Sequence, residues 1–204
     1  MDNQSPFSSD VAFTPTVKAI QARKGSRGNY ARMEADGSWP ATITPDLKEL
    51  DEAQTSVFLA TANARGQPYI QHRGGPAGFL RALDDKTIGF VDYSGNRQFV
   101  TQGNLQENAR AFIFVMDYAH RRRVKIWGEA RVVEGDAELV AKLMPEGYGA
   151  RPEQVILFPV TAWDSKCPTH IPQRFEAADV KAALDARDAK IAALEAEIAR
   201  LRGA

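Results

Sequence analysis

A series of short β-rich segments, separated by turns, constrains the fold of this chain more than any other feature. Val, Ile, Phe, Tyr and Thr are frequent in these segments, and Gly, Pro, Asn or Asp bounds them, which is typical of strands joined by hairpins. The predicted strands are Ser56–Thr61, Tyr69–Arg73, Phe79–Leu83, Thr87–Val91, Ala111–Tyr118, Arg122–Val133 and Val155–Ala162. Repeated strands with short turns and few helices favour a closed or partly open antiparallel barrel.

Two helices are expected ahead of these strands. A short helix at Thr16–Lys24 lies in an N-terminal arm, residues 1–44, that is rich in Ser, Gly, Pro and charge, and Lys24–Asn29 is expected to be a turn or loop. A second helix is predicted at Pro45–Ala53, because a Thr precedes its first residue as N-cap and Pro suits the first helical position. We expect the arm to lie over a barrel domain that covers residues 45–175.

The last zone, residues 176–204, has the period of a coiled coil. Apolar side chains recur at alternating spacings of four and three, with Arg187 as the exception. The positions are Val180, Leu184, Arg187, Ile191, Leu194, Ile198 and Leu201. Ile at a with Leu at d favours two parallel strands, in which Lys190 reaches Glu195 and Glu197 reaches Arg202 of a partner. The alternative is a single amphipathic helix packed on its own barrel.

Charge and composition exclude several classes of partner. Lys plus Arg equals Asp plus Glu, at 26 each, so no net field attracts nucleic acid or an anionic membrane. The longest apolar runs, such as Ala111–Met116, are too short to span a bilayer. Cys167 is the only cysteine, and Met1–Ser5 shows no secretion signal. These features predict a cytoplasmic protein that binds neither nucleic acid nor membrane.

Three arginines at strand ends suggest an anion site. Arg97 follows a turn that contains Gly95, Arg73 precedes two glycines, and Arg123 opens a strand. Guanidinium groups and backbone N–H groups at such turns bind phosphate well. These side chains could therefore converge on a single dianion; the alternative is that they are solvated surface arginines at turns.

The ordered set of segments resembles the pyridoxamine 5′-phosphate oxidase-like, FMN-binding split-barrel superfamily. The similarity runs from Leu50 to Phe175, and its pieces occur in family order: Val57–Thr61 through Gly66–Tyr69, then Phe90–Arg97, then Arg123–Ala130, and finally Trp163 through Arg174-Phe175. The resemblance implies a mainly β fold with flanking helices, a six-stranded antiparallel split β-barrel. It also implies a homodimer, paired through the barrel, that holds flavin mononucleotide (FMN) at its interface, and we expect the C-terminal coil to reinforce this pairing.

The resemblance assigns roles to residues by position. It implies that Gln71, His72 and Arg73 line the flavin, that Val91 and Asp92 contact it from the next strand, and that Arg97 binds the phosphate. Gln98 stands where the oxidases have a second cation. Arg123 falls where a glutamine of the partner subunit often approaches. Trp163 and Arg174 match residues that close the site, and His170 lies in a stretch that touches substrate.

Two departures separate this chain from the vitamin B6 oxidases. Pro76 occupies the position of a lysine that binds the substrate phosphate, and Tyr148 with Arg151 is only a loose counterpart of their second phosphate cluster. We therefore expect an FMN-binding relative and not the oxidase itself.

The predicted function is an FMN-dependent oxidoreductase that acts on an unknown small-molecule substrate or electron donor. His170 is the candidate proton donor or substrate contact. The alternative is a non-catalytic flavin or haem carrier or sensor. Cys167 and His170 alone supply too few ligands for a structural metal site, so no metal is predicted.

Overall fold

The computed structural model of the chain describes residues 6–165 and 168–203. These residues form two compact units, one built from residues 6–116 with 123–165 and the other from residues 117–122 with 168–203. The first unit contains most of the sheet. The second contains the tip of one hairpin and the C-terminal helix. The domain bounds expected from the sequence remain predictions.

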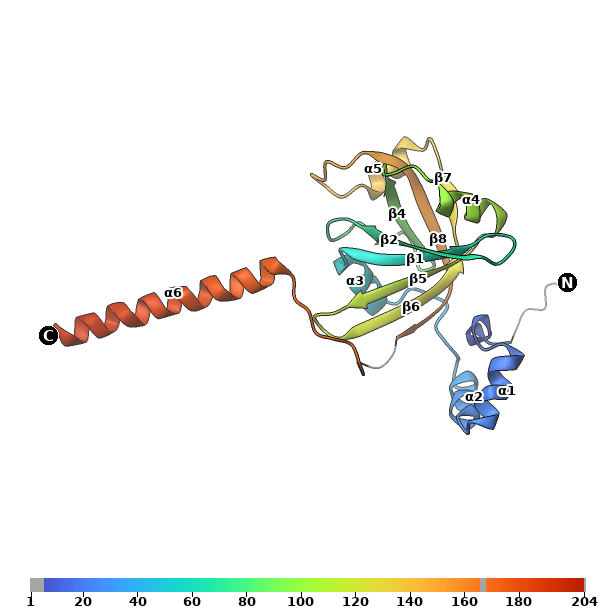
Figure 1. Cartoon of the computed structure of the whole chain (residues 1–204), viewed down its shortest axis with the longest axis horizontal. Helices are drawn as coiled ribbons and strands as arrows, with labels where there is room; N and C mark the ends of the chain where they lie inside the picture. The colour runs from blue at the N-terminus through green and yellow to red at the C-terminus, as the bar shows by residue number, and fades with distance from the viewer. Residues whose placement is uncertain (1–5, 166–167, 204) are drawn as a thin grey trace. The chain divides into compact units, whose positions relative to one another are not determined.

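A curled antiparallel sheet of eight strands dominates the structure (Figure 1). Its strands are β1 (Ser56–Ala62), β2 (Pro68–Gly74), β3 (Arg81–Ala82), β4 (Thr87–Tyr93), β5 (Arg110–Asp117), β6 (Arg122–Glu129), β7 (Arg131–Val133) and β8 (Pro152–Ser165). They are ordered β2-β1-β5-β6-β8-β4-β3, and β7 also pairs with β8. The predicted class, a mainly β split barrel with flanking helices, is confirmed. The predicted count of six strands is wrong, since the sheet has eight.

The predicted strand Arg122–Val133 is in fact two strands, because β8 pairs with β6 along one half and with β7 along the other. The register shifts at Gly128, where a Cβ atom would lie 2.3 Å from the carbonyl oxygen of Pro159. Only glycine allows the two backbones to approach this closely. The chain bends here and continues as β7.

The predicted strand Phe79–Leu83 is reduced to the two residues of β3. Phe79 lies in a turn, where its N–H donates to the carbonyl of Pro76. Phe79 and Leu80 are nevertheless fully buried in the core. Their apolar character therefore reflects core packing from a loop and not strand pairing.

The main core fills the concave side of the sheet. Side chains alternate between buried and partly exposed along β1 and β5, as expected for strands with one face on a core. Val57, Leu59, Ile113 and Val115 point inward, and Leu47 and Leu50 of a covering helix join them. This rigid scaffold fixes the strand ends that carry polar side chains.

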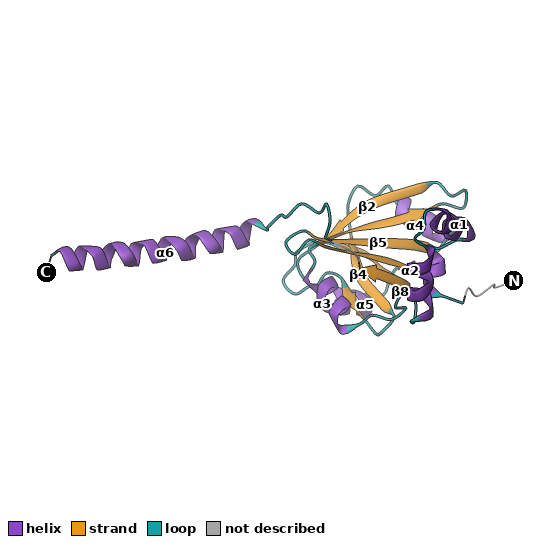
Figure 2. Ribbon diagram, turned by 90° about the horizontal axis from the view of Figure 1, so that it is seen from below, coloured by secondary structure: helices purple, strands orange, loops and turns teal. Residues whose placement is uncertain are grey.

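Helices flank the sheet (Figure 2). They are η1 (Ser8–Val11), α1 (Pro15–Arg23), α2 (Arg27–Ala35), α3 (Pro45–Ala53), α4 (Val100–Glu107) and α5 (Ala137–Leu143), and the second unit contains a further helix, α6 (Ala177–Arg202). The two predicted N-terminal helices, at Thr16–Lys24 and Pro45–Ala53, are present as α1 and α3. The side chain of Thr14 caps α1 and that of Thr44 caps α3, each accepting a backbone N–H.

The expected loop at Lys24–Asn29 ends earlier than predicted, because α2 begins at Arg27. No strong apolar face marks this helix. It is held instead by Glu34, which is buried and pairs with Arg27 and with Lys18 of α1. The arm contacts the sheet through Trp39, whose ring stacks on that of Trp127 at 4.8 Å between centroids.

The C-terminal helix α6 has no buried residue. Among the described residues, no helix is long and apolar enough to cross a membrane.

Candidate functional site

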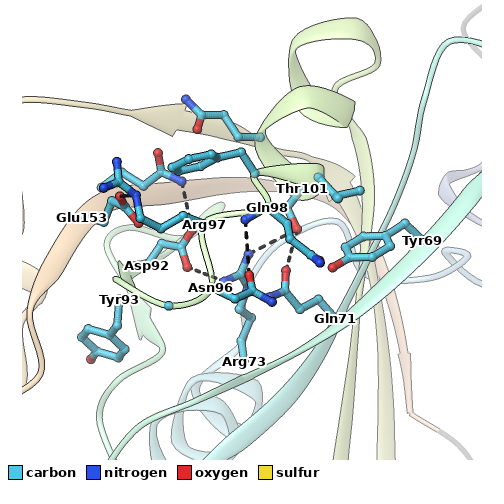
Figure 3. Close-up of a pocket in the computed structure, with 15 residues that line it drawn as sticks. Tyr69, Gln71, Arg73, Asp92, Tyr93, Asn96, Arg97, Gln98, Thr101 and Glu153 are labelled. Atoms are coloured by element: carbon cyan, nitrogen blue, oxygen red, sulfur yellow. Dashed lines mark hydrogen bonds and ion pairs between the residues drawn. The ribbon is translucent and has the colours of Figure 1, made fainter.

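A polar pocket of about 210 Å³ lies where β2, β4, the start of α4 and β8 meet (Figure 3). Tyr69, Gln71 and Arg73 reach it from β2, because alternate residues of a strand share a face. The other lining residues are Asp92, Tyr93, Gly95, Asn96, Arg97, Gln98, Phe99, Val100, Thr101, Gln102, Glu153 and Gln154. The pocket therefore collects side chains from distant parts of the sequence.

Arg73 is the centre of a hydrogen-bonded network. Its guanidinium forms an ion pair with Asp92 Oδ1, and its Nη2 donates to Thr101 Oγ1 at 3.2 Å. Thr101 Oγ1 donates to Gln71 Oε1 at 3.0 Å, and Asp92 Oδ2 accepts from Gln154 Nε2 at 2.9 Å. The network joins β2, β4, α4 and β8, so the orientation of Arg73 is well determined.

One hydrogen-bond donor of Arg73 is unsatisfied. Its Nε is buried and has no hydrogen-bond partner among the described residues. A buried donor without an acceptor is costly, on the order of 1–3 kcal/mol. An acceptor that reached this Nε–H would remove the cost.

The side chain of Arg97 is less constrained than that of Arg73. Its side chain is 66% exposed, and its Nε lies 3.4 Å from Glu153 Oε1. The guanidinium also lies over the ring of Phe99, at 5.5 Å from the centroid. Since an exposed pair of this kind is weak, Arg97 can leave Glu153 for another anion.

The turn before α4 has an unusual backbone. Arg97 and Phe99 both adopt the left-handed conformation, with φ of 58° and 53°. Such residues are uncommon and cluster at binding sites. Phe99 is the N-cap of α4 and provides no side-chain cap, so the first N–H groups of this helix lack a capping side chain. Uncapped helix N-termini favour anions.

Tyr93 contributes an apolar wall and a neutral hydroxyl. Burial, followed by the nearby Tyr148 phenol, raises the pKa of Tyr93 above its usual value, against a smaller opposing effect of Arg81. Its ring meets that of Tyr148 edge to face at 5.2 Å and is directed away from the Arg73 network (Figure 3). Tyr93 therefore borders the polar network without joining it.

The pocket brings together five of the residues singled out from the sequence, namely Gln71, Arg73, Asp92, Arg97 and Gln98. Their role as cofactor contacts remains a prediction. Gln98 also helps to shape the turn, since its N–H lies 3.3 Å from Asn96 Oδ1 and donates to it.

Four other predicted residues of the first unit do not line the pocket. His72 lies on the opposite face of β2, with its ring edge to face with Phe58 at 5.8 Å. Val91 is buried in a small apolar cluster, and Arg123 lies on β6. Trp163 packs against the main core, and its indole Nε1 donates to the carbonyl of Thr42 at 2.8 Å. Their predicted contacts with a cofactor remain untested.

Two predicted residues belong to the second unit. The guanidinium of Arg174 lies over the ring of Tyr118, at 4.6 Å from the centroid. His170 is exposed and adopts a left-handed backbone with φ of 64°. Their roles stay predictions, and Cys167 lies outside the described residues. Within the described ranges, no group of three or more His, Cys, Asp or Glu could hold a metal ion.

Several pocket residues were not identified from the sequence. Tyr69 could have been found, because it precedes Gln71 and Arg73 at the same two-residue spacing on one strand. Glu153 and Gln154 could not, because their position depends on the pairing of β8 with β4, in which Gln154 lies opposite Asp92. Thr101 depends in the same way on the direction of α4.

Comparisons with known proteins identify one family model and several similar solved structures. A family model described as pyridoxamine 5′-phosphate oxidase matches residues 43–167. No curated protein matches the chain.

Among solved structures, a protein of Lactobacillus delbrueckii described as a putative pyridoxamine 5′-phosphate oxidase is 17% identical. This match covers 61% of this chain and 95% of the other, with a TM-score of 0.48. An FMN-binding protein of Syntrophomonas wolfei is 12% identical over 72% and 97% of the two chains, with a TM-score of 0.47. HutZ, a haem storage protein of Vibrio cholerae, is 16% identical over 60% and 93%, with a TM-score of 0.41.

Proposed function

Because the chain belongs to the pyridoxamine 5′-phosphate oxidase family, we propose that its polar pocket binds the phosphate of FMN and that the protein is an FMN-dependent oxidoreductase. The observation that carries the proposal is Arg73, which lines the pocket and holds a buried Nε–H without an acceptor among the described residues. A phosphate oxygen is an acceptor of the required charge.

The residues present fit a phosphate group. Arg73 and Arg97 supply two guanidinium groups, and the uncapped start of α4 supplies backbone N–H groups on the same pocket. Asp92 already holds Arg73 in an ion pair and accepts a hydrogen bond from Gln154, so it offsets part of the charge of Arg73. Its role is to orient Arg73.

Glu153 has a different role. It is the only partner of Arg97 in an ion pair among the described residues, and its carboxylate adds negative charge to the pocket. A phosphate must therefore displace Glu153 from Arg97. This exchange lowers the contribution of Arg97 to the affinity for phosphate.

When bound, the isoalloxazine ring supplies the hydride and electron chemistry, and the protein supplies position and electrostatics. We keep His170 as the proposed proton donor or substrate contact, and Trp163 and Arg174 as residues that close the site. These roles, like those of His72, Val91 and Arg123, derive from the family resemblance. The substrate is proposed to be a small molecule or an electron donor.

A homodimer is part of the proposal. The face of β1 and β5 that points away from the core carries the partly exposed rings of Phe58, Phe112 and Phe114. Ile70, on the adjacent edge strand β2, is 61% exposed. A continuous apolar face of this kind suits a partner surface. We propose that a second copy covers it and that the cofactor lies at the interface. A cytoplasmic location, expected from the single cysteine, also remains part of the proposal.

A carrier or sensor that binds flavin or haem without turnover is the alternative function. It is favoured by the pairing of the pocket's charged groups, since Arg73 and Arg97 each hold a carboxylate and leave no unpaired carboxylate among the described lining residues.

The absorption spectrum of the purified protein tests the cofactor, and a reduction assay tests the activity. Flavin bands that move to the supernatant as FMN after heating would support the proposal, whereas a Soret band would replace FMN by haem. Oxidation of NADH or NADPH in the presence of an electron acceptor would support an enzyme. Bound FMN without any turnover would support the carrier.

A further inference from the structure

The helix α6 carries an apolar stripe that nothing in the described chain covers. All its described residues are exposed, including Leu194 at 54% and Leu201 at 61%. In proteins, most of the stability of a helix comes from packing of its apolar face. Coverage of the stripe by another helix would stabilise it.

We propose that α6 pairs with α6 of a second copy of this chain as a parallel, in-register, two-stranded coiled coil. The proposal does not depend on flavin binding. The a positions are Leu184, Ile191 and Ile198, and the d positions are Val180, Arg187, Leu194 and Leu201. Ile at a with Leu at d is the combination that favours two parallel strands.

The flanking charges are complementary in the parallel arrangement. Residues at g face residues at e of the next heptad on the other helix. Lys190 therefore faces Glu195 of the second copy, and Glu197 faces Arg202 of the second copy. Symmetry makes each contact twice, and all of them are attractive.

The antiparallel arrangement is disfavoured by the same residues. If Ile191 packs against Leu194 of a reversed helix, residues at e face one another. Lys181 then faces Arg202, and Asp188 faces Glu195, so like charges meet along this flank. Only the flank of Lys190 with Glu197 stays attractive. The charge pattern therefore selects a direction, which apolar spacing alone does not.

Arg187 interrupts the apolar seam at a d position. In a parallel, in-register pair the two copies of Arg187 share one layer, and each packs beside residue e of the other helix, which here is Asp188. The guanidinium can extend to that carboxylate while its methylene groups stay in the seam. A polar layer of this kind costs stability and fixes the register, because any shift places Arg187 against an apolar layer.

Within one helix, Glu197 also pairs with Arg200 at 2.6 Å. This pair competes for Glu197 in the coil. The contact between Lys190 and Glu195 has no such competitor among the ion pairs found in α6, so it is the better one to test.

Disulfide trapping in the full chain tests the arrangement. Cys167→Ser removes the native thiol, and Leu201→Cys then places one thiol near the end of the seam. In the parallel coil, the two copies of position 201 face each other, and mild oxidation is expected to convert most of the protein to a linked dimer. Ala196→Cys, on the outer side of the same helix, is the matched control. Its yield of linked dimer is expected to be at least tenfold lower.

In the antiparallel coil, the two copies of position 201 lie roughly 25 Å apart, at about 1.5 Å per residue of helix. A mixture of Leu184→Cys and Leu201→Cys chains would then link, while Leu201→Cys alone would not. That result, or equal linking at positions 196 and 201, would overturn the proposal. Because the barrel can pair on its own, linkage at a defined position is a sharper test than the oligomeric state.

A charge exchange provides a second readout. Lys190→Glu in the Leu201→Cys background places two glutamates together and is expected to lower the yield of linked dimer severalfold. Adding Glu195→Lys restores opposite charges and is expected to restore the yield. Equal loss in the single and double variants would contradict the predicted pairing of these two residues.

Discussion

The Nε of Arg97 lies 3.4 Å from Oε1 of Glu153, in the pocket that also contains Arg73. The pair joins the turn before α4 to β8, and Arg97 remains 66% exposed. The two arginines therefore have different roles in the pocket. Arg73 is held rigidly by Asp92 and Thr101, whereas Arg97 is free to move onto a ligand.

Arg97→Ala is expected to weaken FMN binding at least tenfold, because it removes one charge-assisted contact with the phosphate. Fluorescence titration with FMN measures the change. Arg131→Ala, which removes an exposed arginine of β7, is the control and should leave the affinity unchanged. Equal FMN affinity in the Arg97 variant and the native protein would remove Arg97 from the site.

Glu153→Gln is expected to act in the opposite direction. The substitution removes a negative charge from the pocket and frees Arg97, so FMN should bind about two- to fivefold more tightly, as expected for loss of a weak, exposed ion pair. The same titration measures it, and the gain should shrink as salt is added. Weaker binding would show that Glu153 supports the ligand instead of competing with it.

Gly128→Ala is expected to destabilise the protein by about 1–3 kcal/mol, because the added Cβ would lie 2.3 Å from the carbonyl oxygen of Pro159. Gly103→Ala is a matched control within α4, where a Cβ meets nothing within 4 Å. There, alanine should stabilise the helix by roughly 0.5–1 kcal/mol. Chemical denaturation measures both, and opposite signs are the expected result.

Asp51 makes the stability depend on pH. Burial, followed by the charge of Glu52, raises the pKa of Asp51 from 3.8 to about 8, and both carboxylate oxygens lack a partner among the described residues. The folded protein binds this proton more tightly than the unfolded chain does. The contribution therefore favours folding below pH 3.8 and is lost as the pH rises to about 8.

Asp51→Asn is accordingly expected to flatten the fall in unfolding free energy between about pH 5 and about pH 8. Urea denaturation at a series of pH values measures this slope. Asp46→Asn changes an exposed carboxylate of the same helix and is the control. A slope that persists in the Asp51 variant would assign the pH dependence to another group.

Elements whose ends are set by neighbouring residues in the sequence were predicted. The Thr-Pro start of α3 is one case, since Thr44 caps the helix as expected. α2 was not predicted, because it depends on the buried Glu34, whose partner Lys18 lies on another helix. The break between β6 and β7 depends on the close approach of Gly128 to Pro159, which involves distant residues.

The same distinction holds for the site. Gln71 and Arg73 share one strand face, and their spacing alone places them together. Glu153 and Gln154 reach the pocket only through the register of β8 on β4. The left-handed turn at Arg97 and Phe99, which aims the start of α4 at the pocket, contains no glycine at either position and so left no mark in the sequence.

The affinity of the native protein for FMN relative to riboflavin tests the central claim most directly, because the two ligands differ only in the phosphate. If Arg73, Arg97 and the start of α4 bind that phosphate, FMN should bind at least about tenfold more tightly at low salt, and the difference should narrow as salt rises. Equal affinities for the two flavins, or no binding of either, would contradict the account.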